Sequence, residues 1–261
     1  MVDPLTHTLA AVLIGRAVFG RLAPGTVILL AAGANLPDLD LLAGAAGLGS
    51  YLSHRGPAHS FILAPVLALA LTGAVALFQP HGVAWRTAWP AAFAGVLSNP
   101  LLDALTPHGV QLLWPFTGGY FHLDLAASID LWIWAILLFG LLWPWFSRLV
   151  SSEIGERAGT GRGAAIAALA LFTAYCGGRY LLHERALAIL ESHLYHGEIP
   201  RTVAALPAPV NPFRWVGVVE GRTFSLHLNL NLLEEFDPLK PGTVINYKVF
   251  EKDAADAGLQ Q

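Results

Sequence analysis

Histidine and aspartate residues recur in short polar clusters that interrupt an otherwise apolar chain. Residues 1–150 contain six acidic side chains, and all six are aspartates. The clusters hold the following residues: Asp3 and His7; Asp38 and Asp40; His54 and His59; Asp103 and His108; and His122, Asp124 and Asp130. Imidazole and carboxylate groups hold Zn²⁺, Mn²⁺ or Fe²⁺ in sites that lack thiolates. The clusters therefore predict a hydrolytic site with one or two metal ions, most favourably zinc.

Each cluster taken alone also has a structural interpretation. The Pro-Asp-Leu-Asp run at residues 37–40 is typical of a turn that ends a helix. Asp3 is a good N-cap for the helix that follows it, and His59-Ser60 could simply start another helix. The metal hypothesis is favoured because five such clusters fall at successive segment ends, which turns alone explain poorly.

Composition excludes several classes of protein. Of the 261 residues, 55% are hydrophobic and 13% charged, and the mean hydropathy is +0.55. The formal net charge is −3, so the chain lacks the basic field that a nucleic-acid partner requires. Cys176 is the single cysteine, which excludes both an internal disulfide and a cysteine-based zinc cluster.

The elements that must position these side chains are predominantly apolar segments. Three segments are about as long as the hydrocarbon core of a bilayer. Residues 88–102 form a shorter segment with two prolines, and two helices too short to span a bilayer are expected near the N-terminus. The long segments are 60–78, 129–147 and 164–182, and the short pair is 8–19 and 26–34. The fold class expected is mainly α, a polytopic membrane helical bundle with a small C-terminal antiparallel β appendage.

In an alternating bundle, the clusters would lie at one face of the membrane, because they occupy starts and ends of segments in turn. Most arginines between the segments would then lie at the opposite face, which the positive-inside rule makes cytoplasmic. We therefore expect a multi-pass protein of the bacterial inner membrane, with the metal site and the C-terminus outside the cytoplasm.

The pattern of apolar residues changes after about residue 186, from long apolar segments to short stretches typical of strands. Residues 224–232 alternate apolar and polar side chains, which predicts a half-buried strand, and 215–219 and 244–250 are two further strand candidates. Prolines between 199 and 212 predict an extended connection. We expect a membrane-embedded metal-site domain at 1–185 and an extracytoplasmic linker and β domain at 186–261.

Five motifs, taken in this order, resemble a bacterial family of inner-membrane proteins predicted to be metal-dependent hydrolases, one member of which is LexA-regulated. The resemblance covers residues 1 to about 145 closely, and residues 205–215 are similar to the family's extracytoplasmic continuation. The motifs are Asp3-Pro4-x-Thr6-His7, Leu36-Pro37-Asp38-x-Asp40, His54-Arg55-Gly56-x-x-His59-Ser60, Asn99-Pro100-Leu101-Leu102-Asp103-x-x-Thr106 and Trp114-Pro115-Phe116.

The family is in turn similar to zinc-dependent phospholipase C in its helical arrangement of histidine and aspartate. That resemblance implies the following ligands: His7, Asp38, His54, His59 and Asp103, with Asp40 a further ligand or a base. Asp130 is added as a ligand because its segment starts at the same predicted face. Many relatives have histidine in place of Asn99, which affects the expected number of ions. Many also have threonine in place of Ala58, so this chain lacks one hydroxyl near His59.

The predicted mechanism is metal-assisted hydrolysis of a phosphoester such as a lipid head group at the membrane surface. Asp40 would accept a proton, and Arg55 would stabilise developing negative charge or, alternatively, pair with Asp38 or Asp40. The side chains expected near the substrate are Ser60, Asn99, His108, His122 and Asp124. Two alternatives remain: a non-catalytic, metal-stabilised membrane protein, such as a partner-binding stress factor, and a transporter.

Overall fold

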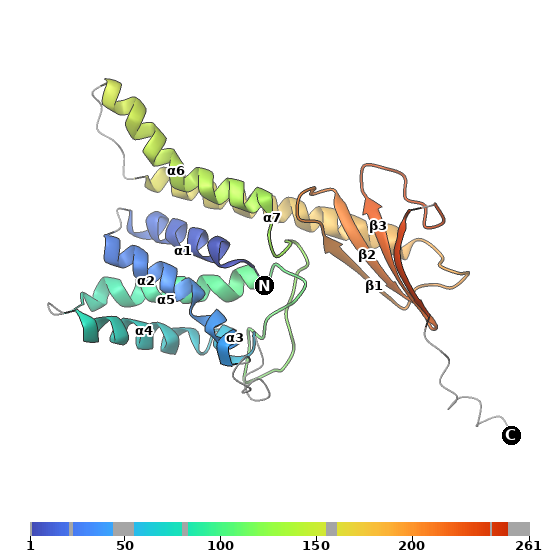
Figure 1. The fold of residues 1–261 in the computed structure, drawn as a ribbon, viewed down its shortest axis with the longest axis horizontal. Coiled ribbons are helices and arrows are strands. Elements are labelled where there is room, and N and C mark those ends of the chain that lie inside the picture. The colour runs from blue at the N-terminus through green and yellow to red at the C-terminus, as the bar shows by residue number, and fades with distance from the viewer. Residues whose placement is uncertain are drawn as a thin grey trace. The chain divides into compact units, whose positions relative to one another are not determined.

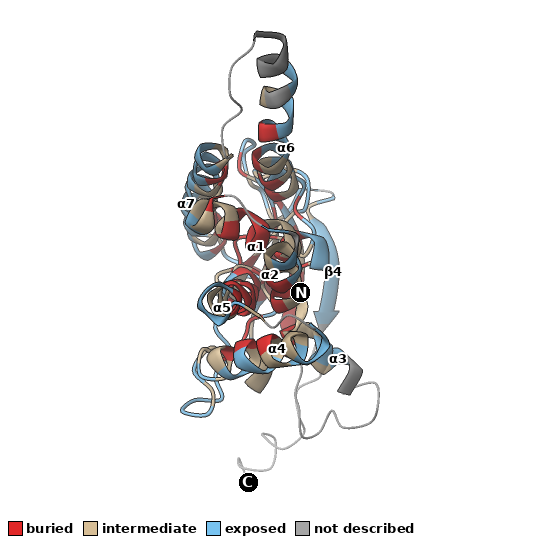
Figure 2. Cartoon of the chain, turned by 90° about the vertical axis from the view of Figure 1, so that its left-hand side faces the viewer, coloured by how far each residue is buried: buried red, intermediate tan, exposed pale blue. Residues whose placement is uncertain are grey.

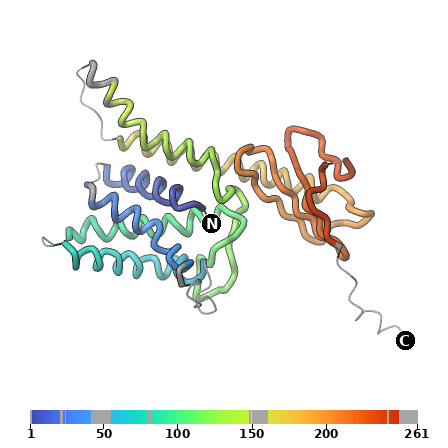
Figure 3. Tube along the Cα trace, in the orientation of Figure 1, coloured from blue at the N-terminus to red at the C-terminus, as the bar shows by residue number. Residues whose placement is uncertain are grey.

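A computed structural model describes residues 2–20, 23–43, 55–79, 83–154, 161–240 and 242–249. The chain forms two compact units. The first, called the helical unit, comprises Met1–Leu123 and Ser128–Tyr175. The second, called the sheet unit, comprises Asp124–Ala127 and Cys176–Gln261. Figure 3 traces both units along the chain, and each is described by itself below.

The helical unit is built mainly from helices, and the longest described connection between two of them is the non-helical stretch at residues 104–130 (Figure 1). The elements described are α1 (Pro4–Phe19), α2 (Pro24–Asn35), η1 (Pro37–Leu39), α3 (Asp40–Ala43), η3 (Pro57–His59), α4 (Ala64–Phe78), α5 (Trp85–Asp103), α6 (Leu131–Ile154) and the first part of α7 (Arg162–Glu191). Helix α5 packs against α1, α2 and α4. Small side chains such as Ala11, Ala34 and Ala92 form the buried core there, and Figure 2 shows this burial along α1 and α5.

Helices α2 and α5 approach each other unusually closely at two glycines. A Cβ atom added to Gly33 would lie 2.6 Å from the carbonyl oxygen of Ala92, and Gly95 meets the backbone of α2 in the same way. No other residue type fits at this contact without moving the helices apart. The contact therefore sets the distance between the C-terminal ends of α2 and α5.

The predicted polytopic membrane bundle is wrong. Among the described residues, only α7 is long and apolar enough to cross a membrane by length and composition. Helices α1, α2 and α4 contain 16, 12 and 15 residues, and a helix of 15 residues is about 22 Å long against a hydrocarbon core of about 30 Å. The apolar segment at 60–78 was misleading because residues 60–63 precede the start of α4.

The sheet unit is a four-stranded antiparallel sheet in the order β1-β2-β3-β4. Its strands are β1 (Thr202–Pro207), β2 (Arg214–Glu220), β3 (Phe224–Asn231) and β4 (Val244–Val249). Residues from the second half of α7, including Ala186 and Leu190, share its core with Trp215 and Leu228. The three strands predicted from the alternating pattern are confirmed. The first strand was expected to be only an extended connection.

Candidate metal centre

The first turn of α1 positions His7. The Asp3 side chain caps this helix by accepting hydrogen bonds from the Thr6 amide at 3.0 Å and the Thr6 hydroxyl at 2.6 Å. Pro4, whose ring fixes a helical φ angle, is the first helical residue. Asp3 thus has the capping role that its position predicts, while His7 faces inward and is completely buried.

The turn after α2 positions Asp38. Pro37 starts a single turn of 3₁₀ helix, and the Asp38 carboxylate then meets α5. The Asn99 amide nitrogen donates to Asp38 Oδ2 at 2.9 Å and to the carbonyl oxygen of Ala34, also at 2.9 Å. Asn99 therefore ties the end of α2 to α5 and orients the carboxylate.

Two further side chains complete the arrangement. His59 is the last residue of η3 and Asp103 the last residue of α5, and both are completely buried. The backbone amide of Val2 donates to Asp103 Oδ1 at 2.9 Å, which orients that carboxylate. Sequence patterns missed this contact because a backbone amide leaves no residue signature.

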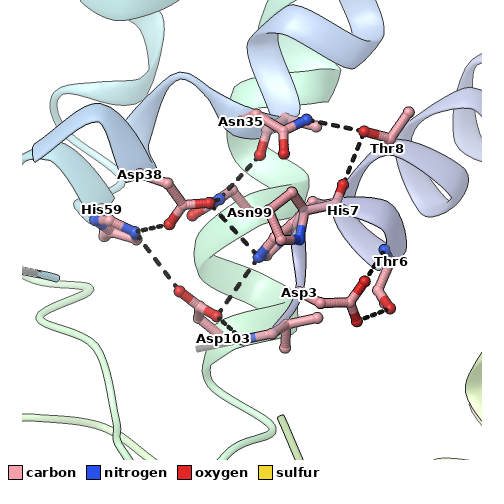
Figure 4. Close-up of polar contacts among 12 residues, drawn as sticks. Asp3, Thr6, His7, Thr8, Asn35, Asp38, His59, Asn99 and Asp103 are labelled. Atoms are coloured by element: carbon pink, nitrogen blue, oxygen red, sulfur yellow. Dashed lines mark hydrogen bonds and ion pairs between the residues drawn. The ribbon is translucent and has the colours of Figure 1, made fainter. Parts of the chain in front are cut away.

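Four side chains contact one another in a closed ring (Figure 4). They are His7, Asp38, His59 and Asp103, and we call this cluster the His/Asp ring. His7 Nε2 lies 3.9 Å from Asp38 Oδ2 and 3.6 Å from Asp103 Oδ1. The second histidine contacts the same two carboxylates: His59 Nε2 lies 3.3 Å from Asp38 Oδ1 and 3.6 Å from Asp103 Oδ2. Each histidine thus faces both carboxylates.

These separations fit ligands of a single metal ion. Two ligand atoms about 2.1 Å from one ion at a tetrahedral angle lie about 3.4 Å apart. One nitrogen or oxygen atom from each of His7, Asp38 and Asp103 can be chosen so that all three lie within 4.8 Å of one another. Both His7 nitrogens are buried and have no hydrogen-bond partner within the described ranges. Such groups are costly unless something binds them.

The second nitrogen of His59 faces Asp40. His59 Nδ1 lies 3.4 Å from Asp40 Oδ2, and the same oxygen accepts the Arg55 backbone amide at 3.0 Å. A carboxylate on the far side of an imidazole fixes the tautomer and the direction of the ligating nitrogen. The geometry thus gives Asp40 an orienting role behind His59.

Charge within the cluster shifts two pKa values in opposite directions. Burial by itself would lower the pKa of His59, but the hydrogen bonds to Asp38 and Asp40 and the nearby negative charges raise it to about 9. Burial by itself would raise the pKa of Asp103, but His7, the Val2 amide and Arg55 hold it below its ordinary value. The metal-free site therefore combines a protonated His59 with an ionised Asp103 near neutral pH.

Arg55 lies beside the ring. Its Nε atom is 4.0 Å from Asp103 Oδ2, and its Nη1 atom donates to the carbonyl oxygen of Gly109 at 3.3 Å. The side chain is buried, and the backbone adopts a φ angle of 65°. This conformation is uncommon for a residue other than glycine and is often found at functional sites.

The remaining predicted site residues lie elsewhere or have other contacts. Asp130 caps α6 by accepting from the Trp132 and Ile133 amides, and it also accepts from the Tyr175 hydroxyl. The Ser60 hydroxyl donates to the carbonyl of Pro57, which stabilises the turn. The others are His108 and His122, whose side chains are exposed; Asp124, which is buried in the sheet unit; and His54, which lies outside the described residues.

Comparison with known proteins identifies the family. The profile of the YdjM inner membrane protein family matches residues 1–186. No curated protein and no solved structure matches the chain. The matched range includes all four members of the His/Asp ring and ends within α7, before the sheet. Because the profile covers more than half of the chain, the protein belongs to the YdjM family of inner membrane proteins.

Proposed function

We propose that this protein is a membrane-bound, metal-dependent hydrolase that acts on a phosphoester such as a lipid head group. The observation that carries the proposal is the His/Asp ring, in which two histidines and two carboxylates face one another at 3.3 to 3.9 Å. Mixed nitrogen and oxygen ligands without thiolates favour zinc, with manganese or iron as other candidates.

The residues around the ring have separable roles in this proposal. A bound divalent ion would supply Lewis-acid activation of water and of the phosphoryl group. Asp40 holds His59 in the orientation in which Nε2 faces Asp38 and Asp103. Arg55 places a buried positive charge 4.0 Å from Asp103, where it can stabilise negative charge that develops on a phosphoryl oxygen.

Exposed leucines beside the ligands support a lipid substrate. Leu5, Leu39 and Leu101 each lie within two residues of a ring member, and their exposed fractions are 44%, 54% and 49%. In an inner membrane protein, apolar side chains in such positions favour contact with acyl chains. A phosphoester at the head of a lipid would then lie close to the ring.

A second candidate is a structural metal site without turnover. It is favoured by the burial of His7, His59 and Asp103, each of which is 0% exposed. A structural site has a closed ligand shell, whereas a catalytic site keeps one position open to solvent or substrate.

The experiment that separates these candidates measures metal content and activity together. Full-length protein purified in mild detergent is analysed for metals and assayed with a soluble phosphodiester and with phosphatidylcholine vesicles. The variant Asp103→Asn keeps an acceptor for the Val2 amide but removes a charged ligand, and Asp130→Asn is its matched control. We expect about one equivalent of metal, lost only in Asp103→Asn, with hydrolysis lost in parallel.

Three other outcomes are informative. Stoichiometric metal without hydrolysis of either substrate, combined with a lower melting temperature after chelation, supports the structural site and contradicts the hydrolase. Equal metal loss in both variants contradicts the ligand assignment. Well-folded protein that binds no metal after supplementation contradicts both candidates.

The orientation in the membrane is part of the proposal. In the sequence, Arg148 and Arg157 precede α7 and Arg162 is its first residue, whereas Arg201 is the first arginine after its end. The positive-inside rule therefore favours a cytoplasmic N-terminal end of α7 and an extracytoplasmic sheet. A topology reporter fused after Gln261 should be active outside the cytoplasm. Labelling of a Leu39→Cys variant, with Cys176 replaced, by an impermeant maleimide tests whether the metal site also lies outside.

A further inference from the structure

The non-helical stretch after α5 contains a loop rich in aromatic residues. Figure 1 shows this stretch at the same end of the helical unit as α3. We call residues 113–121 the aromatic loop, because four of its nine side chains are aromatic: Trp114, Phe116, Tyr120 and Phe121. Residues 104–121 contain no Asp, Glu, Lys or Arg. Surface segments without helical structure are usually polar, so this composition is unusual.

The apolar side chains of the aromatic loop face outward. Phe116 is 81% exposed and Leu113 is 56% exposed. Every residue from Pro115 to Phe121 is exposed. Contiguous apolar side chains on a protein surface mark places where the protein contacts a membrane or a partner. The aromatic loop is therefore a contact surface of the helical unit.

Hydrogen bonds within the loop give it a defined shape. Val110 and Phe121 exchange two backbone hydrogen bonds, of 3.0 and 2.9 Å, which close the base of the loop. Across the loop, the Gln111 side chain donates to the carbonyl oxygen of Gly118 at 3.0 Å. Because these bonds satisfy backbone groups internally, the aromatic side chains can face outward on a folded scaffold.

The base of the loop is joined to the segment that supplies His59 to the His/Asp ring. The Gln111 amide donates to the carbonyl oxygen of Arg55 at 3.0 Å, and the Phe61 amide donates to the carbonyl oxygen of Leu112, also at 3.0 Å. Arg55 and Phe61 lie on either side of His59 in the sequence. The position of the aromatic loop is therefore coupled to that of the ring.

We propose that the aromatic loop docks in the interfacial region of a phospholipid bilayer. The occupant follows from the family, whose members are inner membrane proteins, and from a loop that combines exposed aromatic side chains with an absence of charge. Aromatic side chains of membrane proteins concentrate where the hydrocarbon meets the head groups. The hydrocarbon core itself is excluded, because lipid-exposed non-helical backbone would leave peptide groups without hydrogen bonds there.

Docking of the loop determines how deep the His/Asp ring lies. Because backbone hydrogen bonds join the loop to the segment around His59, a loop at the interface places the ring near the lipid head groups. The inference concerns where the helical unit meets lipid, so it does not depend on whether the ring binds metal or hydrolyses phosphoesters.

The test measures the depth of the loop in a bilayer. Full-length Phe116→Cys protein, which also carries Cys176→Ser, is labelled with an environment-sensitive fluorophore and reconstituted into phosphatidylcholine vesicles. Quenching is compared for iodide on both sides of the vesicles, for lipids spin-labelled near the head group, and for lipids spin-labelled deep in the acyl chain. Leu113→Cys provides a second position in the loop. Leu239→Cys is the matched control, because Leu239 is 89% exposed in a non-helical segment that is rich in charged residues.

We expect the shallow spin label to quench both loop positions at least about twofold more than the deep one, with little quenching by iodide. The Leu239→Cys label should be quenched by iodide alone. Adding Phe116→Asp to Leu113→Cys should reduce the lipid quenching, because a charged side chain disfavours the interface.

Three results would overturn the proposal. The first is quenching of both loop positions by iodide without quenching by lipid, which would place the loop in water. The second is stronger quenching by the deep spin label. The third is protection of both positions from iodide and from both spin-labelled lipids, which would show that a second copy of the chain covers the loop. None of these results bears on metal content, so the inference and the proposed function are tested separately.

Discussion

The helical unit and the sheet unit both bury ionisable side chains, but they satisfy them in different ways. In the sheet unit, the Arg179 side chain is 1% exposed. Its Nε donates to the Leu125 carbonyl at 2.8 Å, and its Nη1 donates to the carbonyl of Pro212. Its Cζ lies 4.2 Å from the centroid of the Trp215 ring. In the helical unit, the members of the His/Asp ring face one another, and His7 has no hydrogen-bond partner in the described part of the chain.

This difference separates a structural buried charge from a candidate functional one. Carbonyl groups and an aromatic face stabilise the guanidinium of Arg179. Two carboxylates held on either side of two imidazoles form the arrangement that the proposed divalent ion would occupy. Burial alone therefore does not distinguish the two units, and the proposal of a functional site rests on the convergence of the buried groups on one another.

The first prediction concerns Trp215, which packs against the buried Arg179 in the sheet unit. Trp215→Ala removes a side chain that is 1% exposed in the core, which should lower the free energy of unfolding by about 3–5 kcal/mol. Metal content should stay at the wild-type level. Trp145→Ala, at a 56% exposed position on α6, is the matched control and should change stability little. Denaturation in detergent micelles measures the stability, and elemental analysis measures the metal content. Loss of metal in Trp215→Ala would show that the core of the sheet unit and the His/Asp ring are not independent of each other.

The second prediction concerns the closest contact of α2 and α5. Gly95→Ala places a methyl group against the backbone of α2, so it should destabilise the protein by about 1–3 kcal/mol. It should also weaken metal binding, because Asp38 and Asp103 follow these two helices. Gly73→Ala, in the middle of α4 with nothing within 4 Å of the added group, should be neutral or stabilising. Calorimetric metal titration of both variants provides the test, and equal affinities would mean that the helix contact does not control the ring.

The third prediction is a pH dependence of metal binding. The pKa of His59 is raised to about 9 in the metal-free site, and Asp103 stays ionised because its pKa is lowered. A metal must displace the His59 proton, so affinity should rise about tenfold per pH unit between roughly pH 6 and 8. Asp40→Asn removes one group that favours the protonated form and should make this slope shallower. A wild-type affinity that does not change over this range would exclude His59 as a ligand.

The smallest expected effect is at Asp130. Asp130→Ala removes the acceptor for two backbone amides at the start of α6, which should cost about 1 kcal/mol of stability. Metal content should not change, although the sequence pattern placed Asp130 among the ligands. Thermal unfolding tests the stability, and elemental analysis tests the metal content. Loss of metal in Asp130→Ala would show that Asp130 is a ligand after all.

Much of the local structure was predictable because it depends on neighbouring residues. The apolar segments predicted the positions of α1, α2, α5, α6 and α7 to within a few residues at most ends, and strict alternation predicted β3. Asp3 was recognised as a cap from its place before Pro4-Leu5-Thr6. The fold class was predicted incorrectly because an apolar segment can be longer than the helix that it contains. Residues 60–63, for example, are apolar in part but precede the start of α4.

The residue types available for chemistry, and the segment ends at which they lie, could be predicted from the amino-acid sequence. It could not distinguish Asp38 and Asp103, which face His7, from Asp130, which caps a helix, because all three are aspartates next to apolar segments. The distinction depends on helix packing, since the contact of Gly33 with α5 brings the ends of two helices together although they are far apart in the sequence. Side-chain convergence over such a separation depends on how ridges and grooves of two distant helices fit together, and no single local motif specifies that fit.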